Sequence, residues 1–248
     1  MPTEKTPNMQ ENPLYFFSIV IPAHNEEKYL GETLKHVCML DYPKDRFEAI
    51  VVENGSTDRT LPIARGFERD NVRILQSEKG VSRAKNLGLD NTSQKSDWTI
   101  FLDADTCVAP LFLRELSKFL NNEVRRDAAV GAVSLRPIEK MHWYVPLFMS
   151  FYNFSRKIMH IPFALEIMRT SLRSKVRFDE TIQFAEDVKL IEDGMRYGSF
   201  FFFPTRTVST SIRRFEKIGW GKQLFLWGWQ GLVLSKTNHR SDVYPVIR

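Results

Sequence analysis

The segment FLDADT (101–106) places two carboxylates, Asp103 and Asp105, one residue apart at the end of a hydrophobic run. If this run is a strand, its alternation puts both side chains on one face, and the strand end brings them close to water. Carboxylate oxygens in such a place suit Mg²⁺ or Mn²⁺, which proteins hold through one or two carboxylates together with substrate phosphates. An isolated D-x-D is also typical of a solvated turn with an aspartate cap, so the rest of the sequence must decide.

A second pair of acids, Glu186 and Asp187, occurs in AEDVKL (185–190). Acids in this position are typical of the first turn of a helix, where they interact favourably with the helix dipole. A carboxylate can also act as a general base when it lies within about 3 Å of a reacting hydroxyl. The pair therefore has a structural and a catalytic interpretation.

Two further polar clusters, AHNE (23–26) and ENGSTD (53–58), each follow an apolar run. Glycine and small polar residues after such a run are typical of a strand-to-helix turn. Asn25 and Asp58 are residue types that cap helix N-termini, and either can also contact a ligand. Both interpretations stay open at this point.

The elements that must position these residues follow from periodicity. Short apolar runs predict strands over 16–22, 72–75, 98–105 and 128–135, and a further strand that ends at Val52. Helical spacing and capping residues predict helices over 27–40, 80–89, 110–120 (with Pro110 in the first turn) and 184–198. This alternation predicts an α/β fold: a Rossmann-like, mostly parallel central sheet with helices on both faces. Ligands of such sheets bind at the carboxyl ends of the strands, where the polar clusters lie.

Composition limits the classes of function. The chain has 248 residues, 43% of them hydrophobic, which is enough for one domain with a sizeable core. Its net charge of +5 suits an anionic partner such as a nucleotide, a phosphorylated substrate, a membrane surface or nucleic acid. The acidic clusters argue against nucleic acid. Cys38 and Cys107 lack metal-ligand spacing, which indicates reduced thiols and a cytoplasmic setting.

Two aromatic segments, 141–163 and 215–234, bear on membranes. The longest stretches without Asp, Glu, Lys or Arg, 141–155 and 223–235, are shorter than the roughly 20 residues that span a bilayer, so we expect no spanning helix. Tryptophan and phenylalanine beside lysine and arginine are typical of helices that lie on a membrane surface. Core packing accounts for the aromatic segments, and the alternative hypothesis is peripheral contact with the cytoplasmic face or with a lipid-linked acceptor.

Five motifs in order resemble the family 2 glycosyltransferases, which have the GT-A fold. They are VIPAHNEEKYL (20–30), VVENGSTDRT (51–60), GVSRAKNLGL (80–89), FLDADT (101–106) and AEDVKL (185–190). The resemblance covers residues 16 to about 220 and implies inverting transfer of a sugar from a UDP- or GDP-sugar to a hydroxyl acceptor, lipid-linked or in a cell-envelope glycan. We expect a flexible leader (1–15) and a single GT-A domain (16–248), with a nucleotide-sugar-binding half (16–135) and an acceptor-binding half (136–248).

The resemblance also implies roles for particular residues. Asp105 would hold Mg²⁺ or Mn²⁺, and Asp187 would be the general base. The residues implied to bind substrate are Pro22, Ala23, Glu26, Glu53, Asn54, Lys85, Asp103, Glu186, Arg213 and Arg214. The family usually carries two aspartates where this chain has Glu53 and Asn54, so the identity of the nucleobase stays open. Arg213 and Arg214 are suited to clamp a diphosphate, and they differ from the Q-x-x-R-W signature of processive synthases.

Two other functions share this fold. A sugar-nucleotide nucleotidyltransferase would carry a glycine-rich, basic phosphate loop after the first strand, where this chain has the acidic IPAHNEE (21–27). A catalytically inactive GT-A domain, serving as a membrane or partner scaffold, would have lost the acids at 103–105 or 186–187, and both pairs are present. The sequence therefore favours an enzyme, and it does not decide the oligomeric state.

Overall fold

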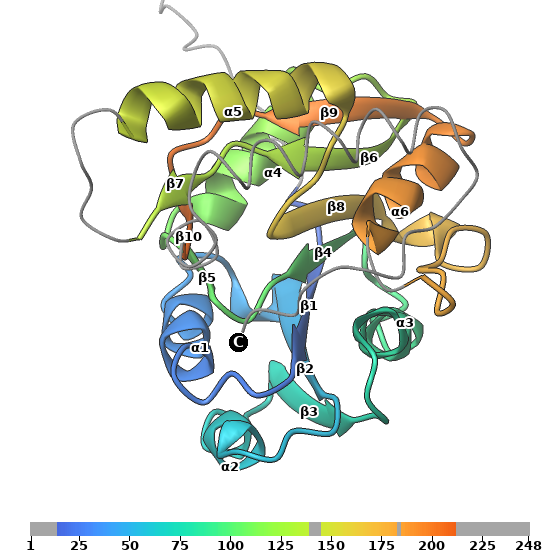
Figure 1. Cartoon of the computed structure of the whole chain (residues 1–248). Coiled ribbons are helices and arrows are strands. Elements are labelled where there is room, and N and C mark those ends of the chain that lie inside the picture. Colours follow the sequence, from blue (N-terminus) through green and yellow to red (C-terminus); the bar gives the residue numbers. More distant parts are fainter. Residues whose placement is uncertain (1–13, 139–144, 183–184, 212–248) are drawn as a thin grey trace, which may run out of the picture.

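The structure is a computed structural model and describes residues 14–138, 145–182 and 185–211 (Figure 1). A seven-stranded sheet has the order β3-β2-β1-β4-β8-β6-β9, and β5, β10 and β7 form a small second sheet. The strands are β1 (Phe17–Ala23), β2 (Phe47–Glu53), β3 (Val72–Gln76), β4 (Trp98–Leu102), β5 (Thr106–Val108), β6 (Ala128–Val133), β7 (Arg136–Pro137), β8 (Leu165–Arg169), β9 (Ser199–Phe203) and β10 (Val208–Thr210). The helices are α1 (Leu30–Cys38), α2 (Thr60–Arg65), α3 (Val81–Asp90), α4 (Phe112–Asn122), α5 (Val145–Met159) and α6 (Glu186–Met195), with 3₁₀ turns at Lys44–Arg46 and Thr170–Leu172.

The large sheet is mostly parallel, as predicted. β1 pairs in parallel with β2 and β4, β2 with β3, and β6 with β9. The exception is β8, which lies antiparallel between β4 and β6. β8 was not predicted from the sequence, because its five residues contain a glutamate and directly follow the aromatic segment 141–163. β8 and β9 nevertheless show that the second half of the chain completes the sheet.

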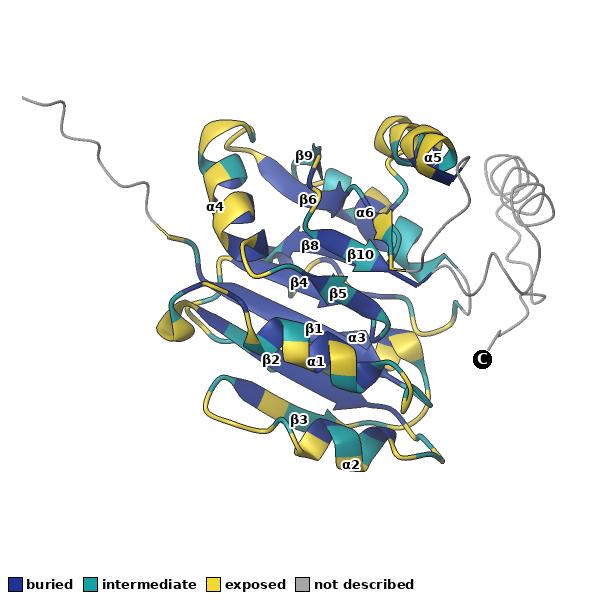
Figure 2. Cartoon of the chain, turned by 90° about the vertical axis from the view of Figure 1, so that its left-hand side faces the viewer, coloured by how far each residue is buried: buried dark blue, intermediate teal, exposed yellow. Residues whose placement is uncertain are grey.

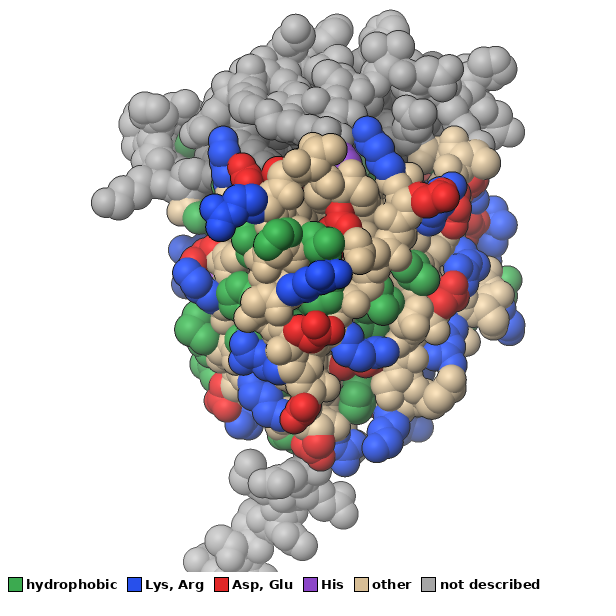
Figure 3. Space-filling view, turned by 90° about the horizontal axis from the view of Figure 1, so that it is seen from below, with side chains coloured by type: hydrophobic (Ala, Val, Ile, Leu, Met, Phe, Trp, Pro, Cys, Tyr) green, Lys and Arg blue, Asp and Glu red, His purple; other side chains and the backbone are tan. Residues whose placement is uncertain are grey.

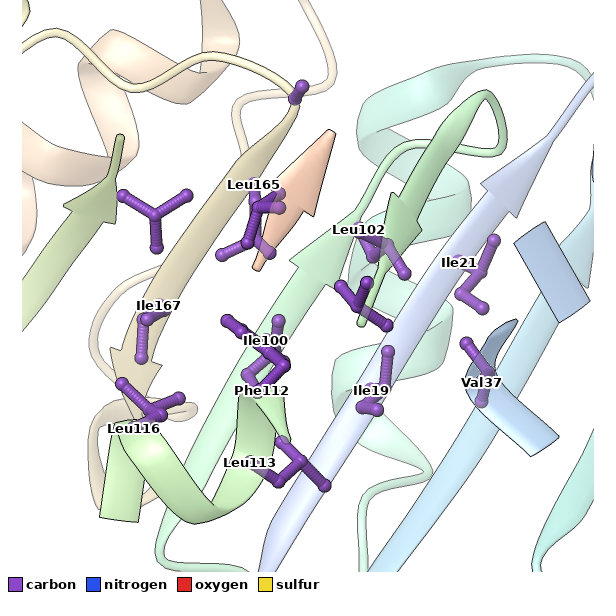
Figure 4. Close-up of a cluster of buried hydrophobic side chains, with 14 of the residues drawn as sticks. Ile19, Ile21, Val37, Ile100, Leu102, Phe112, Leu113, Leu116, Leu165 and Ile167 are labelled. Atoms are coloured by element: carbon purple, nitrogen blue, oxygen red, sulfur yellow. The ribbon is translucent and has the colours of Figure 1, made fainter. Parts of the chain in front are cut away.

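Helices cover both faces of the sheet, which confirms the prediction (Figures 1 and 2). On one face, α1, α2, α4 and α5 pack on a large apolar cluster, part of which is drawn in Figure 4. Its strand residues include Ile19, Ile100 and Ile167. On the other face, α3 and α6 pack on alternate strand residues such as Val20 and Phe101.

Three local expectations are wrong. β4 ends at Leu102, so Asp103 and Asp105 lie in a turn closed by a hydrogen bond from Thr106 N to Asp103 O (3.0 Å), and strand alternation does not set their directions. Helix α4 begins at Phe112, which leaves Pro110 just outside its first turn. Helix α1 begins at Leu30, too far along the chain for Asn25 to cap it.

Some predictions concern residues beyond those described. Arg213, Arg214 and the aromatic segment 215–234 lie outside them, as do residues 1–13 of the predicted leader. Tyr15, which the prediction places in the leader, packs edge-on against Trp98. Within the described residues, no helix is both long and apolar enough to cross a bilayer. On the face seen in Figure 3, Lys and Arg side chains lie among Asp and Glu, so the described residues there form no continuous basic surface.

Candidate active site

The loops after β1 and β2 are held together by hydrogen bonds. Asn54 N donates to Ala23 O (3.0 Å), and Glu26 N donates to the Thr60 hydroxyl (2.8 Å). The Asn25 side-chain oxygen accepts from Thr57 N (2.8 Å), so this residue links the two loops instead of capping a helix. Pro22 and Ala23 end β1 beside them. The sequence-predicted residues of the two motifs thus form one surface at the carboxyl end of the sheet.

Glu53 and Asn54, the two departures from the usual family pattern, are both buried. The Glu53 carboxylate accepts from Ser56 N (2.5 Å) and from Gln76 Nε2 (3.3 Å), which holds the second loop in place. Asn54 is 3% exposed, and its Oδ1 has no hydrogen-bond partner among the described residues. His24 Nε2 is also buried and has no hydrogen-bond partner among the described residues, while His24 Nδ1 lies 2.9 Å from Asn54 O. Buried polar atoms without partners are costly, so these two are candidates for contact with a ligand or water.

Lys85 lies on α3, which begins directly after Gly80. Gly80 has φ +145°, a conformation that residues with a side chain rarely adopt, and this turn starts the helix. The buried Lys85 Nζ lies 3.4 Å from Glu166 Oε2, 3.5 Å from Glu186 Oε1 and 4.7 Å from the centre of the Phe178 ring. Burial opposes its charge, but the surrounding carboxylates, Glu166 and Glu186 foremost, together outweigh burial and raise the pKa of Lys85. Its role as a phosphate contact stays a prediction, since its ammonium here lies between two acids.

Glu186 and Asp187 form the first turn of α6, as predicted from the sequence. Ala185, just before the helix, has a left-handed backbone (φ 61°). Val188 N donates to Asp187 Oδ1 (2.8 Å). Burial and the neighbouring Glu186 carboxylate raise the pKa of Asp187 to about 7, while Lys85 and the Val188 amide oppose the shift. A carboxylate with a raised pKa is a stronger base, and such groups are candidates for proton transfer.

Glu166, at the centre of β8, is a site residue that was not predicted from the sequence. Its side chain is 2% exposed and pairs with Lys85. Burial raises the pKa of Glu166, while the Lys85 ammonium opposes the rise because it favours the ionised carboxylate; Asp187, Asp103 and Glu186 add to the rise. The available signal was a single glutamate inside the apolar stretch FALEIM (163–168). An acid in such a place needs a partner, because an unpaired buried charge is expensive.

Asp103 and Asp105 lie half-buried in the turn after β4. The charge of Asp103 helps to raise the pKa of both Glu166 and Asp187, so Asp103 faces the same group of acids. The described residues contain no cluster of three or more histidine, cysteine or acidic side chains arranged for a metal. Mg²⁺ and Mn²⁺ fit the residues present, because one or two carboxylates at an open turn, together with substrate phosphates and water, are their usual ligands.

The structure therefore brings together Asp103, Lys85, Glu186 and Asp187, which lie far apart in the sequence, and adds Glu166 to them. The first four come from the two predicted halves of the domain, and Lys85 contacts acids on both β8 and α6. The arrangement combines carboxylates with a group whose pKa is raised toward neutral pH. Such groups can transfer protons or contact a cation.

Known proteins match this chain in sequence and in fold. The minor teichoic acid biosynthesis protein GgaA of Bacillus subtilis (strain 168) is 28% identical over 234 residues, covering 79% of this chain and 48% of GgaA. The chain thus spans about half the length of that relative.

Two solved structures share the fold. Staphylococcus aureus TarS 1-349 in complex with UDP-GlcNAc aligns with a TM-score of 0.65 and 21% identity, over 79% of this chain and 58% of that one. The mannosyltransferase PcManGT from Pyrobaculum calidifontis, in complex with GDP-Man and Mn²⁺, aligns with a TM-score of 0.64 and 19% identity, over 86% and 61%. The family model described as glycosyl transferase family 2 matches residues 18–182. The chain therefore belongs to the family 2 glycosyltransferases and has their GT-A fold.

Proposed function

We propose that this protein is a metal-dependent, inverting glycosyltransferase that moves a sugar from a UDP- or GDP-sugar to a hydroxyl acceptor. The observation that carries the proposal is the contact of Lys85, on the donor half, with Glu186, beside Asp187 on the acceptor half (3.5 Å). This contact joins helix α3 of the donor half to the first turn of α6, where the neighbouring Asp187 has a raised pKa that suits a base near neutral pH.

The donor is a nucleotide diphosphate sugar. The buried Asn54 Oδ1 and His24 Nε2, which lack partners among the described residues, offer polar contacts for a nucleobase between the first two loops. Pro22, Ala23, Glu26 and Glu53 shape those loops, and Arg213 and Arg214 remain candidates for the diphosphate. TarS binds UDP-GlcNAc and PcManGT binds GDP-Man, so we keep both nucleotides for this chain.

The transfer is a direct displacement. The acceptor oxygen forms a bond to the anomeric carbon while the bond from that carbon to the diphosphate oxygen breaks on the opposite face. The hydroxyl proton passes to the Asp187 carboxylate, and the nucleoside diphosphate leaves with the bonding electrons. Asp187 acts by position as well as by basicity, since holding the base close to the hydroxyl lowers the barrier.

Asp105 is the proposed ligand of Mg²⁺ or Mn²⁺, with Asp103 as its helper at the ribose or at water on the cation. When bound, the cation offsets negative charge on the departing diphosphate. PcManGT, whose complex contains Mn²⁺, supports this assignment. Asp103 also adds to the negative field around Asp187 and Glu166.

For the acceptor we propose a lipid-linked molecule or a cell-envelope glycan, and for the protein a cytoplasmic location with peripheral membrane contact. The teichoic acid role in the name of GgaA favours an envelope glycan. Much of helix α5 is exposed (Figure 2), and its exposed large apolar residues form a stripe. The stripe comprises Leu147, Phe151, Phe154 and Ile158, which are 60–74% exposed and spaced to share one side of the helix.

Flotation with anionic liposomes tests the membrane contact. We expect the wild type to float, and the Phe151→Ser/Phe154→Ser variant to lose most of this binding, because buried apolar area drives interfacial binding. Met39→Ser/Leu111→Ser, which removes two exposed apolar side chains elsewhere, is the matched control. A wild type that does not float contradicts the membrane contact and leaves the transfer reaction untouched.

A thermal-shift panel tests the donor and the metal. We expect UDP or GDP to raise the melting temperature, and to do so more strongly with Mn²⁺, because a ligand that binds only the folded state stabilises it. Other nucleoside diphosphates and Mn²⁺ alone are the controls. If no nucleoside diphosphate stabilises the protein, the donor assignment and the enzyme proposal both fail.

A further inference from the structure

Glu166 is a carboxylate in the middle of a seven-stranded sheet. It pairs in register with Phe101 on β4 and with Ala132 on β6, so strands flank it on both sides. Its neighbours Leu165 and Ile167 belong to the apolar cluster on the opposite face, so Glu166 faces α3 and α6. An isolated charge in such a place is costly, and the cost is tolerated only where other charges compensate it.

The compensation comes from Lys85. Its Nζ lies 3.4 Å from Glu166 Oε2 and 3.5 Å from Glu186 Oε1, and both side chains of the Glu166 pair are almost fully buried. The three charged groups therefore form a chain from β8 through α3 to the first turn of α6. The residue after Glu186 is Asp187, the proposed base.

Charged groups on the neighbouring elements act on the series Glu166–Lys85–Glu186. Glu186 and Asp187 come from α6, Asp103 from the turn after β4, Lys85 from α3 and the buried Arg156 from α5. The Arg156 guanidinium donates to the carbonyls of Val133 (3.0 Å) and Phe163 (3.3 Å). Counting Glu166, four carboxylates act electrostatically on Lys85, so its charge is shared among more acids than it can neutralise.

Resting on the transfer reaction proposed above, we propose that Glu166 is a positioning residue: it holds the Lys85 ammonium between β8 and α6 and so sets the electrostatic field at Asp187. With Glu166 in place, the charge of Lys85 is divided between two acids on different elements. Without it, the whole ammonium charge acts on Glu186 and Asp187. A nearby cation favours the ionised form of a carboxylate and weakens it as a base.

The Glu166→Gln variant tests the inference, since it removes the charge and keeps the shape. The reaction measured is Mn²⁺-dependent hydrolysis of UDP-GlcNAc or GDP-mannose, with water as the acceptor, for whichever donor the thermal-shift panel selects. We expect kcat to fall about tenfold while the donor KM changes by less than about twofold. We also expect the acidic limb of the pH profile to move down by about one pH unit.

A second readout needs no substrate. Carbon-13 NMR titration of the carboxyl groups reports the pKa of Asp187 directly, and we expect it to fall in Glu166→Gln. Glu48→Gln is the matched control, because Glu48 lies on β2, where it accepts from Ser18 Oγ (2.7 Å) and Arg73 Nη2 (2.9 Å). We expect Glu48→Gln to leave the Asp187 titration and the pH profile unchanged.

Two comparisons decide the outcome. In a Lys85→Met background, adding Glu166→Gln must move the Asp187 titration clearly less than it does with Lys85 present, because only the direct repulsion between the two acids is left and the part that passes through Lys85 is gone. This double variant lacks both buried charges and serves if Glu166→Gln alone does not fold. An Asp187 titration that is the same in Glu166→Gln and wild type overturns the inference and leaves the proposed function standing. A wild type that neither binds nor hydrolyses any donor overturns both.

Discussion

The loops of the donor half and the charged group at the acceptor half are built differently. The loops after β1 and β2 are held by hydrogen bonds that mostly involve backbone amides, such as Asn54 N to Ala23 O (3.0 Å) and Glu26 N to the Thr60 hydroxyl (2.8 Å). At the acceptor side, the buried Glu166 instead pairs with Lys85 of the donor half against the start of α6. The hydrogen bonds fix the shape of the two loops, and the buried charges set the electrostatic field at the start of α6.

This difference indicates a division of labour. A surface that recognises a nucleotide needs its donors and acceptors in place before the ligand arrives, and short loop hydrogen bonds provide this at low cost. A base needs a shifted pKa, which requires burial and nearby charges. Changes in the donor loops should therefore alter binding, whereas changes near α6 should alter turnover. The following predictions test that division in order of expected size.

The largest effect is expected for Asp187→Asn, on the acceptor side. Removing the proposed base should lower transfer by about 10²–10⁴-fold, the usual contribution of general base catalysis. Donor binding, measured by thermal shift, should be retained. Glu192→Gln, an exposed acid on the same helix, is the control and should transfer normally. Full transfer by Asp187→Asn would remove this residue as the base.

The next effect is expected for Asp105→Ala, on the donor side. Loss of the cation ligand should abolish the Mn²⁺-dependent part of the stabilisation by UDP or GDP. A ligand at 100 times its Kd stabilises the folded state by about 2.7 kcal/mol in total, which is the upper limit of this loss. Calorimetric titration with and without Mn²⁺ measures it. Asp45→Ala, at an exposed acid in the 3₁₀ turn, should behave as wild type. An unchanged Mn²⁺ dependence in Asp105→Ala rules out its role as the ligand.

Gly88 and Gly194 allow the packing of one helix from each half to be compared. A Cβ on Gly88 of α3 would lie 2.3 Å from Val20 Cγ1, and one on Gly194 of α6 would lie 2.3 Å from Val130 Cγ1. Each Gly→Ala change should cost about 1–3 kcal/mol of unfolding free energy, because an overpacked core must shift. Gly31→Ala on α1, where the new Cβ meets Ile63 Cγ2 at 3.6 Å, should stabilise the protein by about 0.5–1 kcal/mol through helix propensity.

The same pair of variants also bears on function. Gly194→Ala displaces the helix that carries Asp187 and should lower kcat more than the donor affinity. Gly88→Ala displaces the helix that carries Lys85. This variant tests whether a shift of that helix changes donor affinity, kcat or both. Denaturant unfolding measures the loss of stability, and steady-state kinetics measure kcat and the donor KM. Equal effects of both variants on kcat and on donor affinity would contradict the division of labour.

The smallest effect is on stability as a function of pH. The pKa of Asp187 is raised from 3.8 to about 7, so the folded protein binds more protons than the unfolded chain between these values. Unfolding free energy should therefore decrease as pH rises from about 4 to about 7 and level off above. Because Asp187 is partly exposed, water screens its charge, and we expect Asp187→Asn to be more stable than wild type by only about 1 kcal/mol at pH 8.

Melting curves of the two proteins at pH 5 and pH 8 measure this effect. The gain in stability should be largest at pH 8 and small at pH 5, where Asp187 is protonated in the wild type. Transfer should show the opposite trend, rising through about pH 7 as the base becomes ionised. A variant that is less stable than wild type at pH 8 would contradict the raised pKa.

Much of the donor half follows from the sequence. The apolar runs that became β1, β2 and β4, and the polar clusters at their ends, are local patterns of neighbouring residues, and local patterns determine strands and turns. The same holds for α6, whose acids at 186–187 lie in its first turn as their position in the sequence predicted. Where the prediction was wrong, as at Pro110 and Asp103, the error was a boundary of a few residues.

Only the tertiary structure decided what surrounds Asp187. Sequence periodicity does not reveal that β8 inserts antiparallel between β4 and β6, because strand pairing depends on contacts between residues far apart in the chain. That insertion places Glu166 next to Lys85, 81 residues away, and beside α6. The sequence by itself determined which residues could do chemistry and roughly where each element begins. The fold decided which carboxylates are buried together, and burial with charge is what shifts a pKa.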